Sequence, residues 1–381
     1  MRSPVNPNWT DAIVCLQPIR LAIAFGALCL IVRRWARVSR FVRRALQEGD
    51  ESLTRRLKAM LHTWLGAYYA VLLQGRKVDH IHVHHGYFGS WIAMVAASLL
   101  RIDFSLTLHG SDLLIHDAYL DTKLDCCKFC VTISEYNRTY ILKRFPICDP
   151  KKITVSRLGV EADCGQARNL SFLRENWRFF LLGAGRLHAV KNHAFLIQAC
   201  TQLRAEGLEL ECAIAGAGPE RERLQAQIEH NKMGDRVTLL GHVSRSEMNS
   251  LYRRADLFVL TSLSEGIPLV LMEAMAYGAL VLAPAITGVP ELIIPGKTGF
   301  LYQPGNVADF GGRILFLHRL LRLKRHASAS RLNWIRHAAG AQVRLNFSRR
   351  KNLARFRNEF LKLVAARERS EMSEDTLLQQ I

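Results

Sequence analysis

The sequence is short of cysteine, of acidic residues and of long uninterrupted apolar runs. Nine cysteines in 381 residues are too few for a disulfide scaffold, and a chain of this length does not need one. Aspartate and glutamate number 33 against 52 lysines and arginines, so the formal net charge is +19. This surplus implies a polyanionic partner, such as nucleic acid, an anionic membrane face or a phosphorylated substrate.

The first apolar stretch, residues 12–32, is interrupted by Gln17, Pro18 and Arg20. Its unbroken part, residues 21–32, is shorter than the ~20 residues that a bilayer span needs. A buried helix is therefore favoured over a transmembrane segment. The stretch also lacks the basic n-region of a secretory signal.

A basic amphipathic helix is predicted directly after this stretch. Arginines recur every three or four residues on one face, and apolar side chains fill much of the other: Arg33, Arg37, Arg40 and Arg44 against Val38, Phe41, Val42 and Ala45. Such a helix is either solvated or lies on anionic lipid. The basic segments of the chain lack interleaved aromatic residues and any nucleic-acid-binding motif, so no nucleic-acid partner is expected.

From residue 79 onward, short β-rich runs alternate with helical stretches, which predicts an α/β fold with parallel sheets. The runs form two series: 79–84, 103–108, 129–133 and 153–157, and then 179–183, 210–215, 237–240, 257–261 and 280–283. Hydrophobic residues make up 49% of the chain, enough for full cores. Two successive α/β domains are therefore expected.

We place the N-terminal domain at residues 1–165, with an atypical helical part over 1–75. A linker at 166–177 leads to a C-terminal domain at 178–340. Residues 341–381 form a basic helix and tail that could pack back on the N-terminal domain. Ligands of open α/β sheets bind beyond the carboxyl ends of the strands, so two such domains facing each other would form a binding cleft.

The segment 257–299 carries the strongest chemical signal. A strand is followed by a loop containing Glu265 and Gly266, and Pro268 then occupies the first position of a helix, where its missing N–H costs nothing. Gly278 ends that helix. The free backbone N–H groups at such a helix start form an anion site.

A second carboxylate, Glu273, lies inside this helix in register with Leu269, Met272 and Ala276. It is therefore expected to be partly buried, which costs several kcal/mol unless the carboxylate is hydrogen-bonded. Sugar hydroxyls are suitable partners, and a neighbouring arginine is the structural alternative.

Two cations and two glycines follow the preceding strands of the same domain. Arg186 and Lys191 come after the run 179–183 and are suited to a diphosphate, because arginine offers a bidentate fork and lysine a point charge. Two solvated surface cations would be the alternative. Gly216 and Gly218 form a tight turn after the next run, which is a weak signal alone.

Histidines close two runs of the first domain. His109 follows the run 103–108, where it would face the cleft and could donate a hydrogen bond or share a proton near neutral pH. His82, His84 and His85 do not form a convincing metal site, because no cysteine or carboxylate stands near them in sequence to complete a ligand set.

Together these motifs resemble the retaining glycosyltransferases of family 4, including bacterial enzymes of colanic acid and other exopolysaccharide biosynthesis. The matching segments are HVHHG at 82–86, LTLHGSD at 106–112, ISEYN at 133–137, ITVSRLGVEAD at 153–163, GRLHAVKN at 185–192, GAGP at 216–219, the Glu265…Glu273 pair, TGVPELI at 287–293 and GKTGFL at 296–301. The resemblance implies the GT-B fold, in which two Rossmann-like domains face each other across a cleft.

The resemblance also implies roles for individual residues. Arg186 and Lys191 would hold the donor diphosphate and stabilise the leaving group. Glu265 would contact the donor sugar and Glu273 the ribose hydroxyls, while His109 would lie beside the transferred sugar. The remaining donor contacts would come from Gly216, Gly218, Gly266, Ile267 and Leu269. No metal or other cofactor is expected, because the two cations neutralise the leaving group.

The implied activity is retaining transfer of a hexose from a nucleotide-diphosphate sugar to a glycan or lipid-linked acceptor in cell-surface polysaccharide biosynthesis. The expected place is cytoplasmic, at the inner membrane face, where the basic helices would meet anionic lipid. The opening strand and glycine-rich loop of such enzymes are not found in residues 1–75. The alternatives are therefore a truncated reading frame or a catalytically impaired nucleotide-sugar-binding subunit that acts with a partner.

Overall fold

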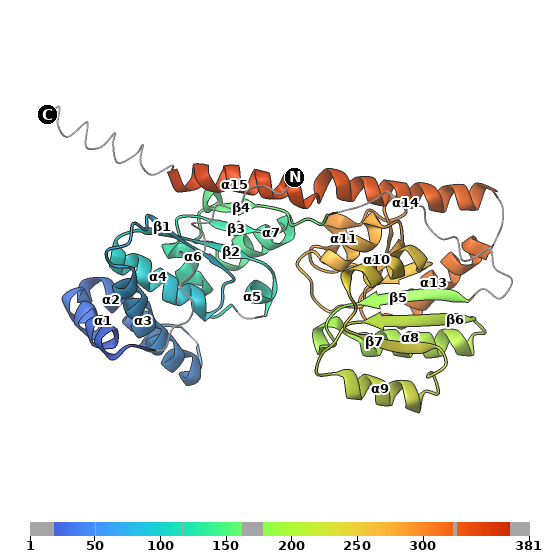
Figure 1. Ribbon diagram of the computed structural model, residues 1–381, viewed down its shortest axis with the longest axis horizontal. Coiled ribbons are helices and arrows are strands. Elements are labelled where there is room, and N and C mark those ends of the chain that lie inside the picture. Colours follow the sequence, from blue (N-terminus) through green and yellow to red (C-terminus); the bar gives the residue numbers. More distant parts are fainter. Residues whose placement is uncertain (1–18, 50, 116, 162–177, 323–325, 366–381) are drawn as a thin grey trace. The chain divides into compact units, whose positions relative to one another are not determined.

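The computed structural model describes residues 19–49, 51–115, 117–161, 178–322 and 326–365 (Figure 1). Its contacts divide the chain into two compact units. The first unit comprises residues 1–107 and 116–130, and the second comprises 108–115 and 131–381. The predicted linker at 166–177 lies outside the described residues, so the domain bounds expected from the sequence stay a prediction.

Helices occupy most of the first unit. Three of them precede the first strand of the described chain, and the remaining elements follow: α1 (Leu21–Arg33), α2 (Trp35–Leu46), α3 (Leu53–Leu73), β1 (His80–His84), α4 (Phe88–Leu100), β2 (Asp103–Leu108) and α6 (Leu120–Cys126). None of the helices in the described ranges combines the length and the apolar character that a membrane crossing requires.

The apolar stretch forms α1, whose Leu21, Phe25 and Val32 are exposed and not buried as expected, and the predicted basic helix follows as α2. Part of its basic face is also used inside the unit. The guanidinium of Arg34 donates to the carbonyl of Leu99, and that of Arg37 donates to the carbonyl of Ser98 at 3.0 Å. The interpretation of one uniformly solvated or lipid-facing arginine row is therefore wrong for Arg37, whereas Arg34 lies outside the predicted row.

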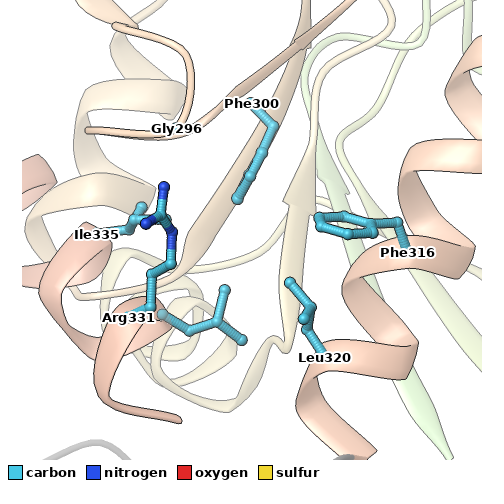
Figure 2. A pocket seen from close by; sticks show the side chains of 7 residues that line it. Gly296, Phe300, Phe316, Leu320, Arg331 and Ile335 are labelled. Carbon is cyan, nitrogen blue, oxygen red and sulfur yellow. The ribbon is translucent and has the colours of Figure 1, made fainter. Parts of the chain in front are cut away.

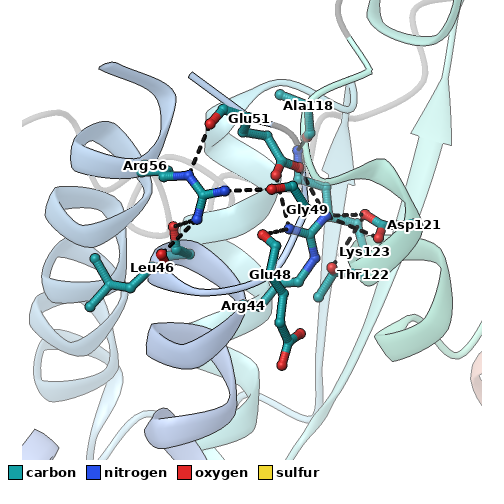
Figure 3. Close-up of polar contacts among 11 residues, drawn as sticks. Arg44, Leu46, Glu48, Gly49, Glu51, Arg56, Ala118, Asp121, Thr122 and Lys123 are labelled. Carbon is teal, nitrogen blue, oxygen red and sulfur yellow. Dashed lines mark hydrogen bonds and ion pairs between the residues drawn. The ribbon is translucent and has the colours of Figure 1, made fainter. Parts of the chain in front are cut away.

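The corner between α2 and α3 is fastened by two arginines (Figure 3). Arg44 pairs with Glu51 at 2.8 Å and with Asp121 at 3.0 Å. Arg56 donates to the backbone carbonyls of Leu46 at 2.6 Å and Glu51 at 2.9 Å. The first of these bonds satisfies a carbonyl at the end of α2 that has no partner within the helix, and the second ties the residue before the N-cap of α3.

A four-stranded sheet has the order β1-β2-β3-β4, and β1 runs parallel to β2 with His80 opposite Asp103 and His84 opposite Thr107. The short elements that complete this region are α5 (Ser111–Leu114), β3 (Cys130–Thr132), α7 (Glu135–Arg144), the 3-10 turn Pro150–Lys152 and β4 (Ile153–Val155). The strands predicted from the first series of β-rich runs are confirmed to within two residues at either end.

The second unit contains a six-stranded sheet with the order β10-β9-β8-β5-β6-β7, in which each neighbouring pair is parallel. Its strands are β5 (Phe179–Ala184), β6 (Leu210–Ala215), β7 (Val237–Gly241), β8 (Leu257–Val259), β9 (Leu280–Pro284) and β10 (Phe300–Tyr302). The central strand β5 is buried over all six residues, as expected for a parallel strand covered on both faces. The last strand, β10, is absent from the sequence prediction.

Both faces of this sheet are covered by helices (Figure 1). Alternate residues of β5 belong to two hydrophobic clusters, with Phe179 and Leu181 in one and Phe180 and Leu182 in the other. The covering helices are α8 (His193–Ala205), α9 (Arg221–His230), α10 (Arg245–Arg254), α11 (Leu269–Ala276), α12 (Val289–Leu292), α13 (Val307–Arg322) and α14 (His326–Asn346). The predicted α/β class with parallel sheets is therefore confirmed.

The chain ends, within the described residues, in α15 (Arg349–Ala365). Asn352 at its start donates to the carbonyl of Leu158 at 3.0 Å, and Val160 forms a β-bridge with Ser348. The start of this basic helix is thus attached to the segment that follows β4.

Candidate active site

The strand order of the six-stranded sheet reverses between β5 and β8. The chain builds β5, β6 and β7 toward one edge and then β8, β9 and β10 toward the other. In parallel α/β sheets, ligands bind at such a reversal, just beyond the carboxyl ends of the strands. The loop after β5 carries Arg186 and Lys191, and the loop after β8 carries Glu265 and Gly266. Topology therefore brings these predicted site residues to one place.

The loop after β5 interlocks with the glycine turn after β6. The amide of Leu187 donates to the carbonyl of Ala217 at 2.9 Å. A Cβ on Gly216 would collide with the carbonyl oxygen of Gly185, and one on Gly218 would collide with that of Leu187. Only glycine allows this close approach. The weak sequence signal of the glycine pair is thus a structural support of the cation-bearing loop.

Lys191 and Glu265 form an ion pair across the two loops. Lys191 ends a short 3-10 turn (Ala189–Lys191), and its Nζ lies 2.5 Å from Glu265 Oε1. Ser262 Oγ donates to the same carboxylate oxygen at 2.6 Å. The backbones are also joined, because the Thr261 hydroxyl donates to the Lys191 carbonyl at 3.0 Å. The structure therefore brings together two of the residues singled out in the sequence.

Arg186 lies on the same loop with its side chain exposed. Within the described residues it makes no side-chain hydrogen bond or ion pair, so its guanidinium is available to an anionic ligand. The helix α11 begins one residue later than predicted, because Pro268 is its N-cap and not its first residue. Pro268 provides no side-chain hydrogen bond to cap the helix. Of the two apolar residues assigned to the donor, Leu269 is exposed whereas the side chain of Ile267 is buried. Ile267 can therefore offer only its backbone.

The segment with His109 lies against the loop after β8. A Cβ on Gly266 would collide with the His109 carbonyl oxygen and would lie 2.6 Å from Ile133 Cδ1. The turn at His109 is held by the buried carboxylate of Asp112, which accepts from the amide of His109 at 3.0 Å and of Gly110 at 2.8 Å. The structure thus places the backbone of His109 directly beside Gly266.

Glu273 is half-buried, as predicted, but its partner is a phenol. The hydroxyl of Tyr252, from α10, donates to Glu273 Oε2 at 2.9 Å. Burial, together with the neighbouring carboxylate, raises the pKa of Tyr252, so the phenol stays a donor. The arginine pairing considered as the structural alternative is not what holds this carboxylate.

The sequence prediction missed several residues that support the site. Tyr252 and Asp112 each fix a predicted residue through a hydrogen bond. Tyr252 stands in no motif, whereas Asp112 ends the motif LTLHGSD at 106–112 but was given no role. His193, at the start of α8, is a third: it is buried beside the loop of Lys191, and burial lowers its pKa, which keeps the ring neutral. In the sequence, only its position two residues after Lys191 indicated that His193 lies near the site.

The histidines of β1 have structural partners. His82 contacts the hydroxyls of Ser105 at 2.7 Å and Thr107 at 2.9 Å on the neighbouring strand. Within the described ranges, the His, Cys, Asp and Glu side chains form no group of three suited to a metal ion.

A cavity of about 350 Å³ in the second unit lies apart from these residues (Figure 2). It is lined by Gly296, Phe300, Phe316, Leu320, Arg331, Leu332 and Ile335, from the 296–300 segment, α13 and α14. Its walls are apolar except at Arg331. The motif at 296–301, which contributed to the resemblance, therefore contacts this cavity and contributes no predicted site residue.

Comparison with known proteins agrees with this architecture. Residues 171–330 match the family model "Glycosyl transferases group 1". That part of the chain is therefore similar to the group 1 glycosyl transferases. The amylovoran biosynthesis glycosyltransferase AmsK of Erwinia amylovora is 32% identical over 176 residues, which cover 45% of this chain and 43% of that protein. The chain thus matches less than half the length of this curated relative.

Solved structures share the fold over more of the chain. A glycosyltransferase from Rickettsia africae superposes with a TM-score of 0.65 at 20% identity, covering 84% of both chains. Anabaena Alr3699/HepE in complex with UDP gives a TM-score of 0.64 at 19% identity, covering 77% of this chain and 82% of that one. These likenesses, at such low identity, show the fold alone. The GT-B fold expected from the sequence is therefore confirmed, and the matched residues 171–330 contain most of the candidate site.

Proposed function

We propose that the protein is a retaining glycosyltransferase of polysaccharide biosynthesis, which moves a hexose from a nucleotide-diphosphate sugar to a glycan or lipid-linked acceptor. The observation that carries the proposal is the meeting of the loops after β5 and β8, which joins Lys191 to Glu265 beside the uncapped start of α11. Two further findings support it: the family match of residues 171–330, and a structural neighbour that is in complex with UDP.

In this proposal each group has a defined task. The exposed Arg186 and the ammonium of Lys191 bind the donor diphosphate, and Lys191 exchanges part of its contact with Glu265 for the phosphate oxygens. Glu273, held by Tyr252, accepts from the ribose hydroxyls. Glu265 and the backbone at Gly266 and Ile267 contact the sugar, as do Leu269 and His109.

The transfer breaks the bond between the sugar C1 and the diphosphate oxygen and forms a bond from C1 to the acceptor oxygen on the same face. The acceptor proton passes to the departing diphosphate. Negative charge grows on the leaving group, where two fixed cations stabilise it by an amount typically worth several kcal/mol. No group of the protein needs to act as a nucleophile, and no metal or other cofactor is required.

The cytoplasmic face of the membrane is the proposed place of action, because the first unit presents an apolar and basic surface. Apolar side chains of α1 and of the start of α2 are exposed: Leu21, Phe25, Leu28, Val32 and Trp35. Exposed arginines stand near them at positions 33, 40 and 43. An apolar stripe bordered by arginine is typical of a helix that lies on anionic lipid.

The proposal is tested with the full chain and a panel of UDP- and GDP-hexoses. Replacing Lys191→Met or Glu273→Gln should weaken donor binding about ten-fold or more, because each removes a charge-assisted contact worth more than 1.4 kcal/mol. Calorimetric titration gives the affinity, and radiolabelled sugar transfer to a lipid-linked acceptor gives the activity.

Lys297→Met and Glu229→Gln are matched controls, since both residues are exposed in the second unit and away from the two loops. Both controls should behave as the wild type. Full transfer by Lys191→Met and Glu273→Gln would contradict the assigned roles. Donor binding without any turnover would favour the alternative, a nucleotide-sugar-binding subunit that acts with a partner.

A further inference from the structure

A second cavity, of about 390 Å³, opens in the first unit where β1 ends. It is lined by Arg55, Gly86, Tyr87, Phe88, Ala118 and Lys123. None of these residues belongs to the candidate site in the second unit. The position just beyond the carboxyl end of a parallel strand is nevertheless where α/β folds bind ligands.

The lining is cationic. Lys123 is only 1% exposed, and its ammonium donates to the carbonyls of Gly86 at 2.7 Å and Ala118 at 2.8 Å, which fixes two walls of the cavity. Arg55 stands beside Arg56 in sequence, yet the two have different tasks: Arg56 ties the α2–α3 corner (Figure 3), whereas Arg55 lines the cavity.

No lining residue is acidic, and although two nearby carboxylates share one guanidinium, Lys123 and Arg55 leave the sum of these charges positive. Glu51 and Asp121 both accept from the guanidinium of Arg44, at 2.8 and 3.0 Å. A buried ammonium and an exposed guanidinium therefore set the sign of the potential inside the cavity. Such a potential attracts an anion.

The start of α4 adds backbone donors to the same wall. This helix has 13 residues, and its N-cap Tyr87 provides no side-chain cap, nor does its first turn contain an acidic residue. The start of this helix lies at the cavity, because Tyr87 and Phe88 line it, and in its first turn the Ser90 amide donates to the Tyr87 carbonyl at 3.0 Å. Amides at a helix start and the helix dipole favour an oxyanion.

Backbone strain and an unsatisfied hydroxyl occur beside the cavity. His85 and Tyr119, next in sequence to the lining residues Gly86 and Ala118, have φ of 75° and 55°. The Tyr119 hydroxyl is buried and has no hydrogen-bond partner among the described residues. Burial raises its pKa although the charges of Arg55 and Arg56 reach it. Strained residues and unpaired buried polar atoms are concentrated at functional sites.

We propose that this cavity binds the phosphate or diphosphate of a phosphorylated, lipid-linked acceptor. Arg55 and the first-turn amides of α4 would contact the oxyanion, and Lys123 would act as a fixed charge beneath it. The binding of the oxyanion stands on the cavity alone, whereas its use as an acceptor site rests on the proposed function.

Hydrogen–deuterium exchange on the full chain tests the proposal, because it locates binding without requiring activity. Inorganic pyrophosphate should slow exchange of the amides at residues 87–90 in the wild type and in Arg76→Gln, an exposed-arginine control on the same unit. In Arg55→Gln the concentration needed for this protection should rise about ten-fold. Unchanged protection in Arg55→Gln, or none at residues 87–90 in the wild type, would overturn the site.

Two further probes identify the source of the phosphate. Farnesyl diphosphate should protect residues 87–90 at lower concentration than pyrophosphate does, if the site serves a lipid-linked acceptor. Protection only by vesicles containing phosphatidylglycerol would instead assign a membrane headgroup site and refute the acceptor assignment. Protection confined to residues 185–191 would refute the cavity proposal while leaving the proposed donor site intact.

Discussion

The carboxylate of Glu273 is positioned by a neutral group. Tyr252 donates its hydroxyl at 2.9 Å, and the same phenol ring stacks on Tyr277 with an interplanar angle of 10°. A neutral donor orients the carboxylate without cancelling its charge. Glu273 therefore keeps acceptor capacity for other hydroxyl donors, which a tight pair with arginine would have reduced.

Replacing Tyr252→Phe should remove this orientation and little else. Hydrogen bonds to charged groups contribute about 1.5–3 kcal/mol, so the variant should unfold at lower denaturant concentration and should need several-fold more donor for half-maximal transfer. Urea unfolding and steady-state kinetics measure the two effects. Tyr277→Phe is the control, because its hydroxyl does not bond to Glu273, and it should change stability by less than about 0.5 kcal/mol. Equal behaviour of the two variants would refute the positioning role.

Among individual residues, the sequence predicted the charged side chains of the candidate site but not the residues that position them. Lys191 and Glu265 could be found because cations and carboxylates at the ends of parallel strands have few uses other than binding. Tyr252 could not, because it comes from α10 and reaches Glu273 only after α10 and α11 pack together. A tyrosine in an amphipathic helix has the same pattern whether its hydroxyl is used or not.

The junction between the loop after β8 and the turn at His109 depends on the absence of a side chain at Gly266. The Gly266 position faces the His109 carbonyl, and a Cβ on Gly288 would in turn collide with the Gly266 carbonyl. Three segments of backbone therefore meet here with no space between them. A site formed by backbone contacts of this kind tolerates little displacement.

Gly266→Ala should force the loop away from the His109 turn. Inserting a methyl group into a filled space typically costs about 1–3 kcal/mol, and we expect loss of stability in that range together with weaker donor binding. Gly234→Ala is the control, because a Cβ there meets nothing within 4 Å and the φ of Gly234 is ordinary. Thermal unfolding and donor titration compare the two, and a Gly266→Ala variant as stable as the control would contradict the junction.

The elements themselves follow closely from the sequence where runs are long and apolar. The strands Asp103–Leu108 and Leu210–Ala215 match their predicted bounds, because an apolar residue recurs at every second position over six residues. The three-residue strand Phe300–Tyr302 was missed. The basic amphipathic helix predicted after residue 32 corresponds to α2, but the contacts of Arg37 and Arg44 within the first unit could not be predicted from its periodicity.

Over the whole molecule, the arginines and lysines behind the net charge of +19 have different roles, and the sequence alone does not show which residue has which role. Some arginines, such as Arg44 and Arg56, stabilise loops and helix ends within the first unit. Others, such as Arg33 and Arg40, are exposed near the apolar side chains of α1. Composition predicted an anionic partner, but only side-chain burial shows which cations remain for it.

The exposed apolar side chains of α1 predict that the whole chain binds to anionic membranes. Leu21, Phe25, Leu28 and Val32 follow one another at helical spacing, and Phe25 is 70% exposed. We expect the full chain to sediment with phosphatidylglycerol-containing vesicles and not with phosphatidylcholine alone, and to dissociate as salt screens the arginines. Replacing Phe25→Ala and Val32→Ala together should weaken this binding about ten-fold or more, since each side chain contributes more than 1 kcal/mol when buried.

Ile147→Ala is the matched control. It removes a similar apolar side chain, which belongs to the second unit and is 94% exposed. It should sediment as the wild type does. If the control loses as much binding as the α1 variant, the attachment is not specific to this helix. If the wild type binds neutral and anionic vesicles equally, the arginines have no part in it, and the surplus of positive charge must serve phosphorylated substrates instead.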